Sequence, residues 1–188
     1  MNKLLIKIAK KLNNANITWA LGGSLILKHH NLLENVNDID IIIARSDIFK
    51  AKHIFDSLGE AKRVSPKGIY KTSYFYEYTI DSIEVDVMCE FKIDNQSLYN
   101  YNFDVTKIVD TEILTGTKIY YSSLEDWLVL YTLMGRTKKV ELIKRYFETN
   151  LKINQNLITN ALASAPKKIK QDIESWLSNM KGDVLSNE

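Results

Sequence analysis

Residues 17–24 read Ile-Thr-Trp-Ala-Leu-Gly-Gly-Ser, and residues 37–43 read Asn-Asp-Ile-Asp-Ile-Ile-Ile. The first stretch predicts a β-strand that runs directly into a glycine turn, after which apolar residues resume a helical spacing. The second stretch predicts a buried strand with two acidic residues at its start. Helical spacing returns over residues 48–58 and Gly59 follows, so a further helix is expected there. This part of the chain therefore alternates strands and helices.

Elements on either side extend this pattern. Leucine and isoleucine residues at near-helical spacing predict a first helix over residues 2–12. A β-hairpin is expected over residues 69–91, with its turn near Asp81 and Ser82, and two more short strands are expected over residues 101–121. Together these elements predict a mixed β-sheet flanked by helices.

The character of the sequence changes at Ser123. This serine and Asp126 three residues later form a start that resembles a capping box, and four stretches with helical spacing follow. No segment rich in Pro, Gly or Ser separates the two parts. We therefore expect an α+β protein with a sheet-containing core over residues 1–121 and a C-terminal helical bundle over residues 122–180.

The composition is that of an ordinary globular protein. The 188 residues are 45% hydrophobic and 26% charged, which excludes disordered and low-complexity classes. A net charge of +2 provides no strong field for duplex DNA, and no apolar stretch is long enough to span a membrane. The single cysteine, Cys89, excludes an internal disulfide and a zinc site built from thiolates, so a reducing cytoplasm is the expected location.

Acidic residues on two predicted strands favour a metal site. Asp38 and Asp40 are two residues apart, so a β-strand places both carboxylates on one face. Like charges this close repel unless a cation neutralises them, and hard oxygen ligands suit Mg²⁺ or Mn²⁺. The later stretch 83–88 alternates in the same way and places Glu84 and Asp86 on one face. Asp86 is therefore expected to complete an acidic trio with Asp38 and Asp40.

The glycine turn predicts a phosphate site beside these carboxylates. Gly22 and Gly23 allow the backbone to approach a ligand closely, because neither has a side chain. Ser24 begins a predicted helix, whose free N–H groups and positive dipole end favour a phosphate. The metal and phosphate sites would therefore face each other.

Taken together, these residues resemble the nucleotidyltransferase superfamily with the polymerase-β-type fold. The signature of that family is Gly-Gly-Ser, a spacer, Asp-x-Asp and a third carboxylate on a later strand, matched here at residues 22–24, at Asp38 and Asp40, and at Asp86. Members also tend to follow the sheet with a helix that starts Ser-x-Glu-Asp and ends Gly-Arg, as residues 123–136 do. Small stand-alone members are the most similar, including lincosamide and aminoglycoside nucleotidyltransferases and nucleotidyltransferase toxins or antitoxins.

The resemblance implies a mechanism in which the acidic trio holds two divalent ions that bridge the phosphates of a nucleoside triphosphate. An acceptor hydroxyl would attack the α-phosphorus, and Gly23 and Ser24 would meet the charge of the leaving pyrophosphate. Glu84, which shares the face of Asp86, is a candidate base.

Basic residues after the first C-terminal helix form a second candidate contact for the nucleotide. Arg136, Lys138 and Lys139 lie together in the sequence, and this cluster is equally consistent with a solvated surface and with a contact to a triphosphate or an acceptor. Arg136 is the candidate for the nucleotide contact. Related proteins often carry a lysine in the middle of this helix and an aspartate shortly after Gly-Arg, whereas this chain has Tyr131 and Lys139 at those places.

These features predict an enzyme that transfers a nucleoside monophosphate from a nucleoside triphosphate to a hydroxyl acceptor. The near-neutral charge favours a small-molecule acceptor, because an enzyme that uses tRNA would usually have a more basic surface. Two alternatives stay open: a toxin–antitoxin component of the same fold that acts on a protein or tRNA, and a catalytically silent nucleotide-binding domain. The intact acidic trio argues against the silent domain, since a binding module has little use for uncompensated carboxylates.

Overall fold

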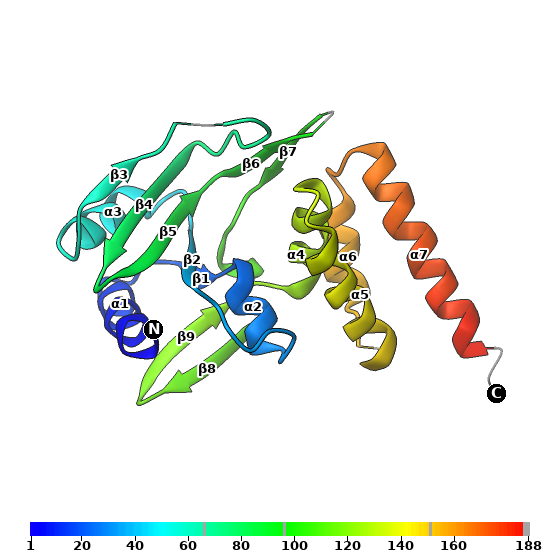
Figure 1. The fold of residues 1–188 in the computed structure, drawn as a ribbon, viewed down its shortest axis with the longest axis horizontal. Coiled ribbons are helices and arrows are strands. Elements are labelled where there is room, and N and C mark those ends of the chain that lie inside the picture. Colours follow the sequence, from blue (N-terminus) through cyan, green and yellow to red (C-terminus); the bar gives the residue numbers. More distant parts are fainter. Residues whose placement is uncertain (66, 96, 151, 186–188) are drawn as a thin grey trace.

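Strands and helices alternate at the start of the chain, and helices alone make up its C-terminal third (Figure 1). The computed structural model describes residues 1–65, 67–95, 97–150 and 152–185. Within these ranges, no helix is both long enough and apolar enough to cross a membrane. The elements, in chain order, are α1 (Asn2–Asn14), β1 (Trp19–Leu21), α2 (Gly23–His29), β2 (Asp38–Ile43), α3 (Ile48–Asp56), β3 (Ala61–Arg63), β4 (Tyr74–Ile80), β5 (Ile83–Cys89), β6 (Phe91–Asp94), β7 (Leu98–Tyr101), the 3₁₀-helix η1 (Val105–Lys107), β8 (Asp110–Leu114), β9 (Thr117–Tyr121), α4 (Leu124–Leu133), α5 (Thr137–Asn150), α6 (Gln155–Leu162) and α7 (Lys167–Leu185).

Seven strands form one mixed sheet, in the order β3-β4-β5-β2-β1-β9-β8. The central strand β2 is parallel to β5 and antiparallel to β1, and β1 is parallel to β9. The remaining pairs, β3–β4, β4–β5 and β8–β9, are antiparallel. The predicted α+β class and mixed sheet are confirmed.

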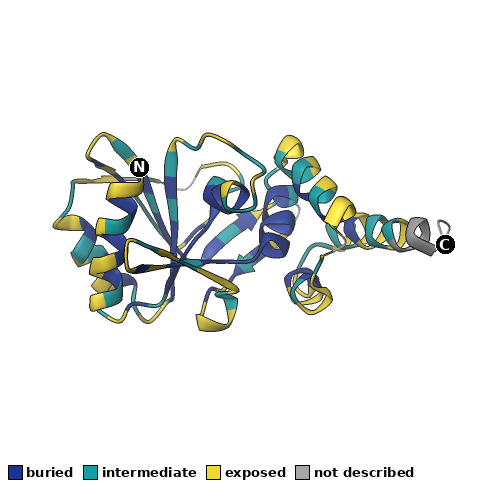
Figure 2. Cartoon of the chain, turned by 90° about the horizontal axis from the view of Figure 1, so that it is seen from below, coloured by how far each residue is buried: buried dark blue, intermediate teal, exposed yellow. Residues whose placement is uncertain are grey.

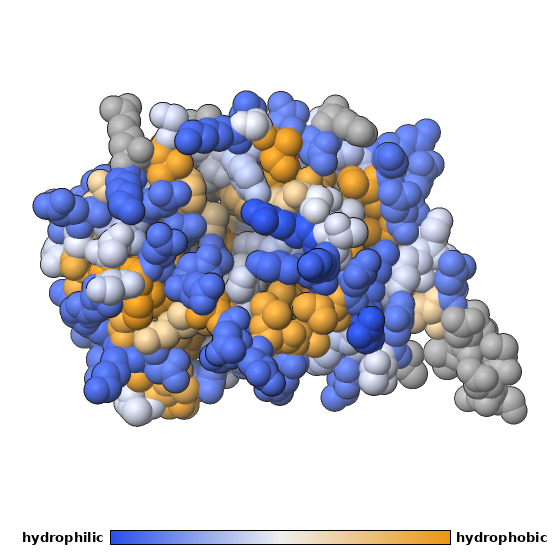
Figure 3. Space-filling view, viewed as in Figure 1, coloured by the Kyte–Doolittle hydropathy of each residue, from blue (hydrophilic) through white to orange (hydrophobic). Residues whose placement is uncertain are grey.

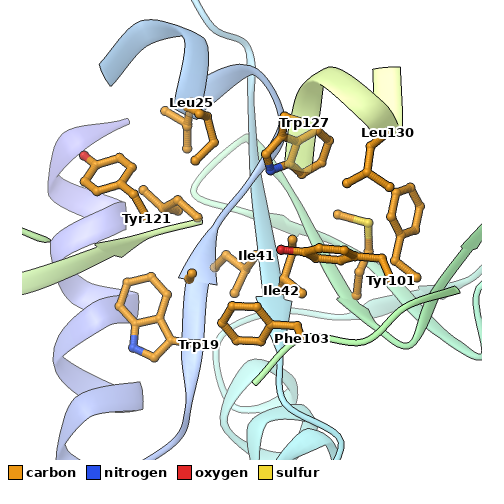
Figure 4. Packing of buried hydrophobic residues seen from close by; sticks show 14 of the residues in the cluster. Trp19, Leu25, Ile41, Ile42, Tyr101, Phe103, Tyr121, Trp127 and Leu130 are labelled. Carbon is orange, nitrogen blue, oxygen red and sulfur yellow. The ribbon is translucent and has the colours of Figure 1, made fainter. Parts of the chain in front are cut away.

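Alternation along β2 separates the hydrophobic core from the opposite face of the sheet. Its three core-facing residues are almost completely buried: they are Ile39, Ile41 and Ile43. On the same face, the Trp19 indole of β1 donates to the Asn13 side chain of α1 at 2.8 Å, and Figure 4 shows Trp19 and Ile41 in this core. Asp38 and Asp40 point to the other face, where α2 lies.

The β6–β7 hairpin links the sheet to the C-terminal helices (Figure 1). The Tyr99 hydroxyl of β7 donates to the Ala161 carbonyl of α6 at 3.0 Å, and the Tyr101 hydroxyl donates to Asp126 of α4 at 3.1 Å. α4 is buried on nearly every side, whereas α7 carries exposed residues along much of its length (Figure 2). The C-terminal helices thus contact the sheet-containing part through α4, through the hairpin and through α5 at Lys139. The division near residue 122 stays a prediction.

Three strands lie outside the sequence-based expectations. β3, β6 and β7 contain three or four residues each, which is too short for a period of two to show in the sequence. The hairpin expected over residues 69–91 begins at Tyr74, and its turn lies at Asp81 and Ser82 as predicted, where both residues have positive φ angles of 50° and 62°. The expected strand pair before residue 121 is β8–β9.

Candidate functional site

Strand register brings the predicted carboxylates together. β2 and β5 are parallel, with Asp40 directly opposite Asp86 and Asp38 opposite Glu84. Residues opposite each other on neighbouring strands share a face of the sheet, so all four side chains lie on the face away from α1 and α3. The acidic trio lines a cavity of about 910 Å³, whereas Glu84 is exposed and is not among the described residues that line it. Figure 3 shows the surface hollowed between the sheet and the C-terminal helices.

A fourth carboxylate in the cavity, Glu77, was not expected from the sequence. β4 pairs antiparallel to β5 with Glu77 directly opposite Asp86, and the Glu77 side chain lines the cavity. The position of Glu77 opposite Asp86 could have been inferred from the predicted turn at Asp81 and Ser82. Counting outward from this turn pairs residue 77 with residue 86, because a tight turn fixes the register of a hairpin.

Desolvation and mutual repulsion perturb these carboxylates. Desolvation, followed by repulsion from Asp38, raises the pKa of Asp40 to about 6. Desolvation, followed by repulsion from Asp40 and then from Glu77, raises the pKa of Asp86 to about 7. The site therefore holds more negative charge at neutral pH than its protein surroundings stabilise, and a bound cation would relieve the repulsion.

The glycine turn packs against one of these carboxylates. Gly23 has a φ angle of 56°, and a β-carbon on it would overlap the Asp40 carboxylate, which also accepts a hydrogen bond from the Ser24 N–H. A β-carbon on Gly22 would overlap the Trp127 ring, and the Gly22 N–H donates to the Asp40 carbonyl at 2.9 Å. Both glycines are therefore needed for close approach. The group that approaches is the Asp40 side chain, and contact with a phosphate stays a prediction.

Two basic side chains line the cavity from the C-terminal helices. Arg136, the residue that precedes α5, is exposed at the cavity. Lys139 is partly buried, and its Nζ donates to Ser24 Oγ at 2.7 Å and to the Tyr131 hydroxyl at 3.4 Å. Desolvation lowers the pKa of Lys139, while attraction to Asp40 and then Asp38 opposes this shift. The cavity therefore combines an acidic region on the sheet with a basic region on the helices.

Aromatic and methionine side chains form much of the remaining wall. They are Tyr70, Tyr74, Phe75, Tyr76, Met88, Phe91, Trp127, Tyr131 and Met134. Trp127 is central to this wall, since its ring centroid lies 5.1 Å from that of Tyr131 and 6.4 Å from that of Phe91. Figure 4 shows Trp127 on α4, close to the strands of the sheet. Such a wall can hold a planar base or an apolar part of an acceptor.

The acidic trio fits a hard divalent cation in its chemistry. Its members offer carboxylate oxygens on adjacent strands, and their charge is poorly compensated. Among the described residues, no three His, Cys, Asp or Glu side chains are gathered closely enough to hold an ion as they stand. The Asp40 carboxylate instead accepts the Ser24 N–H. The predicted ligands are thus adjacent and correctly charged, and their role as metal ligands stays a prediction.

Comparison with known proteins supports the resemblance through structure rather than sequence. No family model matches the chain, and no curated protein sequence matches it. Among solved structures, a candidate nucleotidyltransferase from Thermotoga maritima (TM1012) is 26% identical and superposes with a TM-score of 0.61, covering 79% of this chain and 92% of its own.

Two antibiotic-modifying proteins share the fold at lower identity. The antibiotic-resistance factor ANT(2'')-Ia is 13% identical with a TM-score of 0.57, and the match covers 99% of this chain and 100% of that one. The lincosamide antibiotic adenylyltransferase LnuA is 15% identical with a TM-score of 0.53, over 77% of this chain and 96% of its own. These identities show a common fold alone. With the likeness to the Thermotoga protein and the sheet described above, the chain belongs to the nucleotidyltransferase superfamily of enzymes.

Proposed function

We propose that this protein is an Mg²⁺- or Mn²⁺-dependent nucleotidyltransferase that moves a nucleoside monophosphate from a nucleoside triphosphate to a hydroxyl group of a small molecule. One observation carries the proposal. Asp38, Asp40 and Asp86 lie in register on adjacent strands and face a cavity whose opposite side presents Lys139 and Arg136. A triphosphate bound with a divalent cation has the charge pattern that matches this arrangement.

The acidic trio would hold the metal, which when bound supplies positive charge to the phosphates and lowers the pKa of an acceptor hydroxyl. In the transfer, a bond forms between the acceptor oxygen and the α-phosphorus, and the bond from that phosphorus to the bridging oxygen breaks. Pyrophosphate leaves with the negative charge. Ser24 Oγ, Lys139 and Arg136 would bind the pyrophosphate oxygens, because all three line the cavity and can donate hydrogen bonds.

The hydroxyl proton requires an acceptor on the sheet side of the cavity. Glu84, which shares the face of Asp86, is one candidate base. Glu77 lies opposite Asp86 on the neighbouring strand β4 and lines the cavity, so it is a second candidate base. Separate substitutions of the two glutamates distinguish these candidates.

A small-molecule acceptor is supported by the size and lining of the cavity. A volume of about 910 Å³ is in the upper part of the range for small-molecule pockets, and an aromatic wall is typical of them. The net charge of +2 provides little attraction for tRNA. Two structures of similar fold contain antibiotics or an adenylylated antibiotic, namely LnuA with lincomycin and ANT(2'')-Ia with adenylyl-2''-tobramycin.

The test is a transfer assay with the full chain. The protein is incubated with each α-labelled nucleoside triphosphate, Mg²⁺ or Mn²⁺, and separate acceptor pools: hydroxylated metabolites, lincomycin, tobramycin, bulk tRNA and a protein lysate. We expect label to appear on a small molecule, and to disappear with Asp40→Asn or EDTA. Label on tRNA or protein would support the alternative acceptor class. Absence of transfer together with absence of metal-dependent triphosphate binding by calorimetry would contradict the proposal.

A further inference from the structure

The ammonium group of Lys139 lies at the boundary between the acidic and basic regions of the cavity. It is brought there from α5, 115 positions along the chain from its hydrogen-bond partner Ser24. Gly135, with a φ angle of 66°, ends α4 and allows the turn into α5. The adjacent Lys138 is exposed and does not belong to the described cavity lining. Of these neighbouring lysines, only Lys139 is directed into the site.

The contacts of Lys139 are those of a cation without a fixed anionic partner. Its Nζ donates to Ser24 Oγ at 2.7 Å and lies 4.7 Å from the centroid of the Tyr131 ring. Among the described residues, no carboxylate oxygen lies within ion-pair distance of this nitrogen. Two uncharged oxygens and a ring face therefore hold the ammonium beside the carboxylates but not on them.

The charges that face Lys139 come from two directions. Asp40 and Asp38 attract the ammonium from β2, and Arg136 repels it from the position just before α5. Asp40 is also linked to the same cluster by a hydrogen bond, because its carboxylate accepts the Ser24 N–H. A lysine has four flexible side-chain carbons, so its charge can shift by several ångströms at little cost.

We propose that Lys139 is the resident counter-ion of Asp38 and Asp40 while the site is free of metal and nucleotide, and that the same ammonium binds the triphosphate when nucleotide is present. The first part follows from the position of Lys139, whose ammonium is held in the cavity by Ser24 and is attracted by both aspartates. The second part rests on the proposed function, since it requires a triphosphate in this cavity.

A single substitution of Lys139 should change the affinities for a divalent cation and for a polyphosphate in opposite directions. In Lys139→Met the side chain keeps its approximate length but loses its charge. A divalent cation alone should then bind more tightly, because the positive charge that competes for the carboxylates is gone. A polyphosphate alone should bind more weakly, because a charge-assisted hydrogen bond is lost. A substitution that merely disturbs the fold would weaken both ligands.

The experiment measures binding of two separate probes to the full chain by calorimetry: Mn²⁺ without nucleotide, and inorganic tripolyphosphate in the presence of EDTA. For Lys139→Met we expect Mn²⁺ affinity to rise by about threefold or more. Tripolyphosphate affinity should fall by about tenfold or more. Lys138→Met is the matched control, since it removes the same charge from the neighbouring exposed position, and both affinities should stay near those of the wild type. Lys139→Arg should retain most of the tripolyphosphate affinity.

Two results would overturn the inference about Lys139. One is wild-type affinity for both probes in Lys139→Met, and the other is a loss of both that Lys139→Arg does not restore. Failure of the wild type to bind either probe would instead remove the proposed function together with this inference. The two failures are therefore distinguishable, because the first requires a wild type that binds Mn²⁺ and tripolyphosphate.

Discussion

At the scale of single residues, the site depends on like charges that the sheet holds side by side. Asp40 and Asp86 are opposite each other on β2 and β5, and Glu77 extends the same row onto β4. Desolvation and then repulsion from neighbouring carboxylates raise the pKa of Asp40 and of Asp86, so the row is unfavourable for the isolated protein. Residues that weaken a fold in this way without a compensating partner are characteristic of ligand sites.

The two glutamates beside Asp86 can be assigned by paired substitutions. We expect Glu77→Gln to lower kcat by about tenfold or more with the acceptor found in the transfer assay, because Glu77 lines the cavity and can receive or orient the hydroxyl proton. The matched substitution Glu84→Gln changes the same charge at an exposed position and should have a smaller effect. A fall in kcat with Glu84→Gln alone would assign the base to Glu84, the candidate that the sequence offers.

At the scale of elements, the junction between β1 and α2 determines where Asp40 points. Gly22 accommodates Trp127 of α4, and Gly23 accommodates Asp40 of β2, so two consecutive positions fit side chains from different parts of the chain. The sequence pattern identified this turn because glycine pairs after a strand are conspicuous. It did not identify the neighbours, since these depend on how α4 packs against the sheet.

A substitution at this junction separates backbone strain from steric overlap. Gly23→Ala and Gly68→Ala both place a β-carbon on a residue with a φ of 56°, but only the β-carbon at position 23 meets other atoms. We expect Gly68→Ala to lower the free energy of unfolding by about 1 kcal/mol. Gly23→Ala should lower it by about 3 kcal/mol, since overlap with Asp40 adds to the strain. Chemical denaturation measures both, and equal losses would contradict the close packing of Asp40 on Gly23.

The start of α4 depends on a buried charge. Asp126 is 1% exposed, and its carboxylate accepts hydrogen bonds from Lys107 and from the Tyr101 hydroxyl, both at 3.1 Å. We expect Lys107→Met to lower the free energy of unfolding by about 3 kcal/mol, because it leaves a buried carboxylate without its cation. Lys170→Met breaks an exposed pair with Glu174 and should change it by less than about 0.5 kcal/mol. Similar changes in the two variants would show that Asp126 does not depend on Lys107.

The sequence could predict most helices and the strands β2, β4 and β5, because each shows its period over six or more residues. The three-residue strand β1 could be predicted because a glycine pair follows it. It could not predict β3 or the β6–β7 hairpin, which are short and are fixed by contacts such as that between Tyr99 and Ala161. For the site, alternation places Asp38 with Asp40, and Glu84 with Asp86, on one face of their strands, and the pairing of β2 with β5 brings the acidic trio together. The role of the trio as metal ligands stays a prediction. The place of Glu77 in the site could be predicted only from the register of the β4–β5 hairpin. The contact between Lys139 and Ser24 depends on how α5 packs, which no local sequence pattern encodes.

At the scale of the whole molecule, the cavity lies where the sheet meets the C-terminal helices (Figure 3). Its acidic side belongs to the sheet and its basic side to the start of α5, so the fold brings together charges that are distant in the sequence. The hairpin contacts to α4 and α6 maintain this arrangement. Stability of the molecule and occupancy of the site should therefore be coupled.

The raised pKa values of two carboxylates in this cavity predict an unusual pH dependence of stability. The pKa values of Asp40 and Asp86 are about 6 and about 7 in the folded protein, above the ordinary value of 3.8. Between pH 5 and pH 8 the folded state therefore binds more protons at these groups than the unfolded state, so their contribution to stability is lost as pH rises. In EDTA we expect this contribution to the free energy of unfolding to fall by about 3 kcal/mol over that range.

The measurement is urea denaturation at several pH values with Asp86→Asn as the comparison, because the two proteins differ in one of the titrating carboxylates and share every other group. The pKa of His30 is lowered chiefly by desolvation, so its contribution to the free energy of unfolding rises with pH. This contribution is the same in both proteins. The free energy of Asp86→Asn should fall less steeply between pH 5 and pH 8, and saturating Mn²⁺ should reduce the fall in the wild type, since a cation that binds only the folded state stabilises it. Parallel curves for the two proteins, unchanged by Mn²⁺, would mean that the carboxylate row is not the charged site inferred from the sheet.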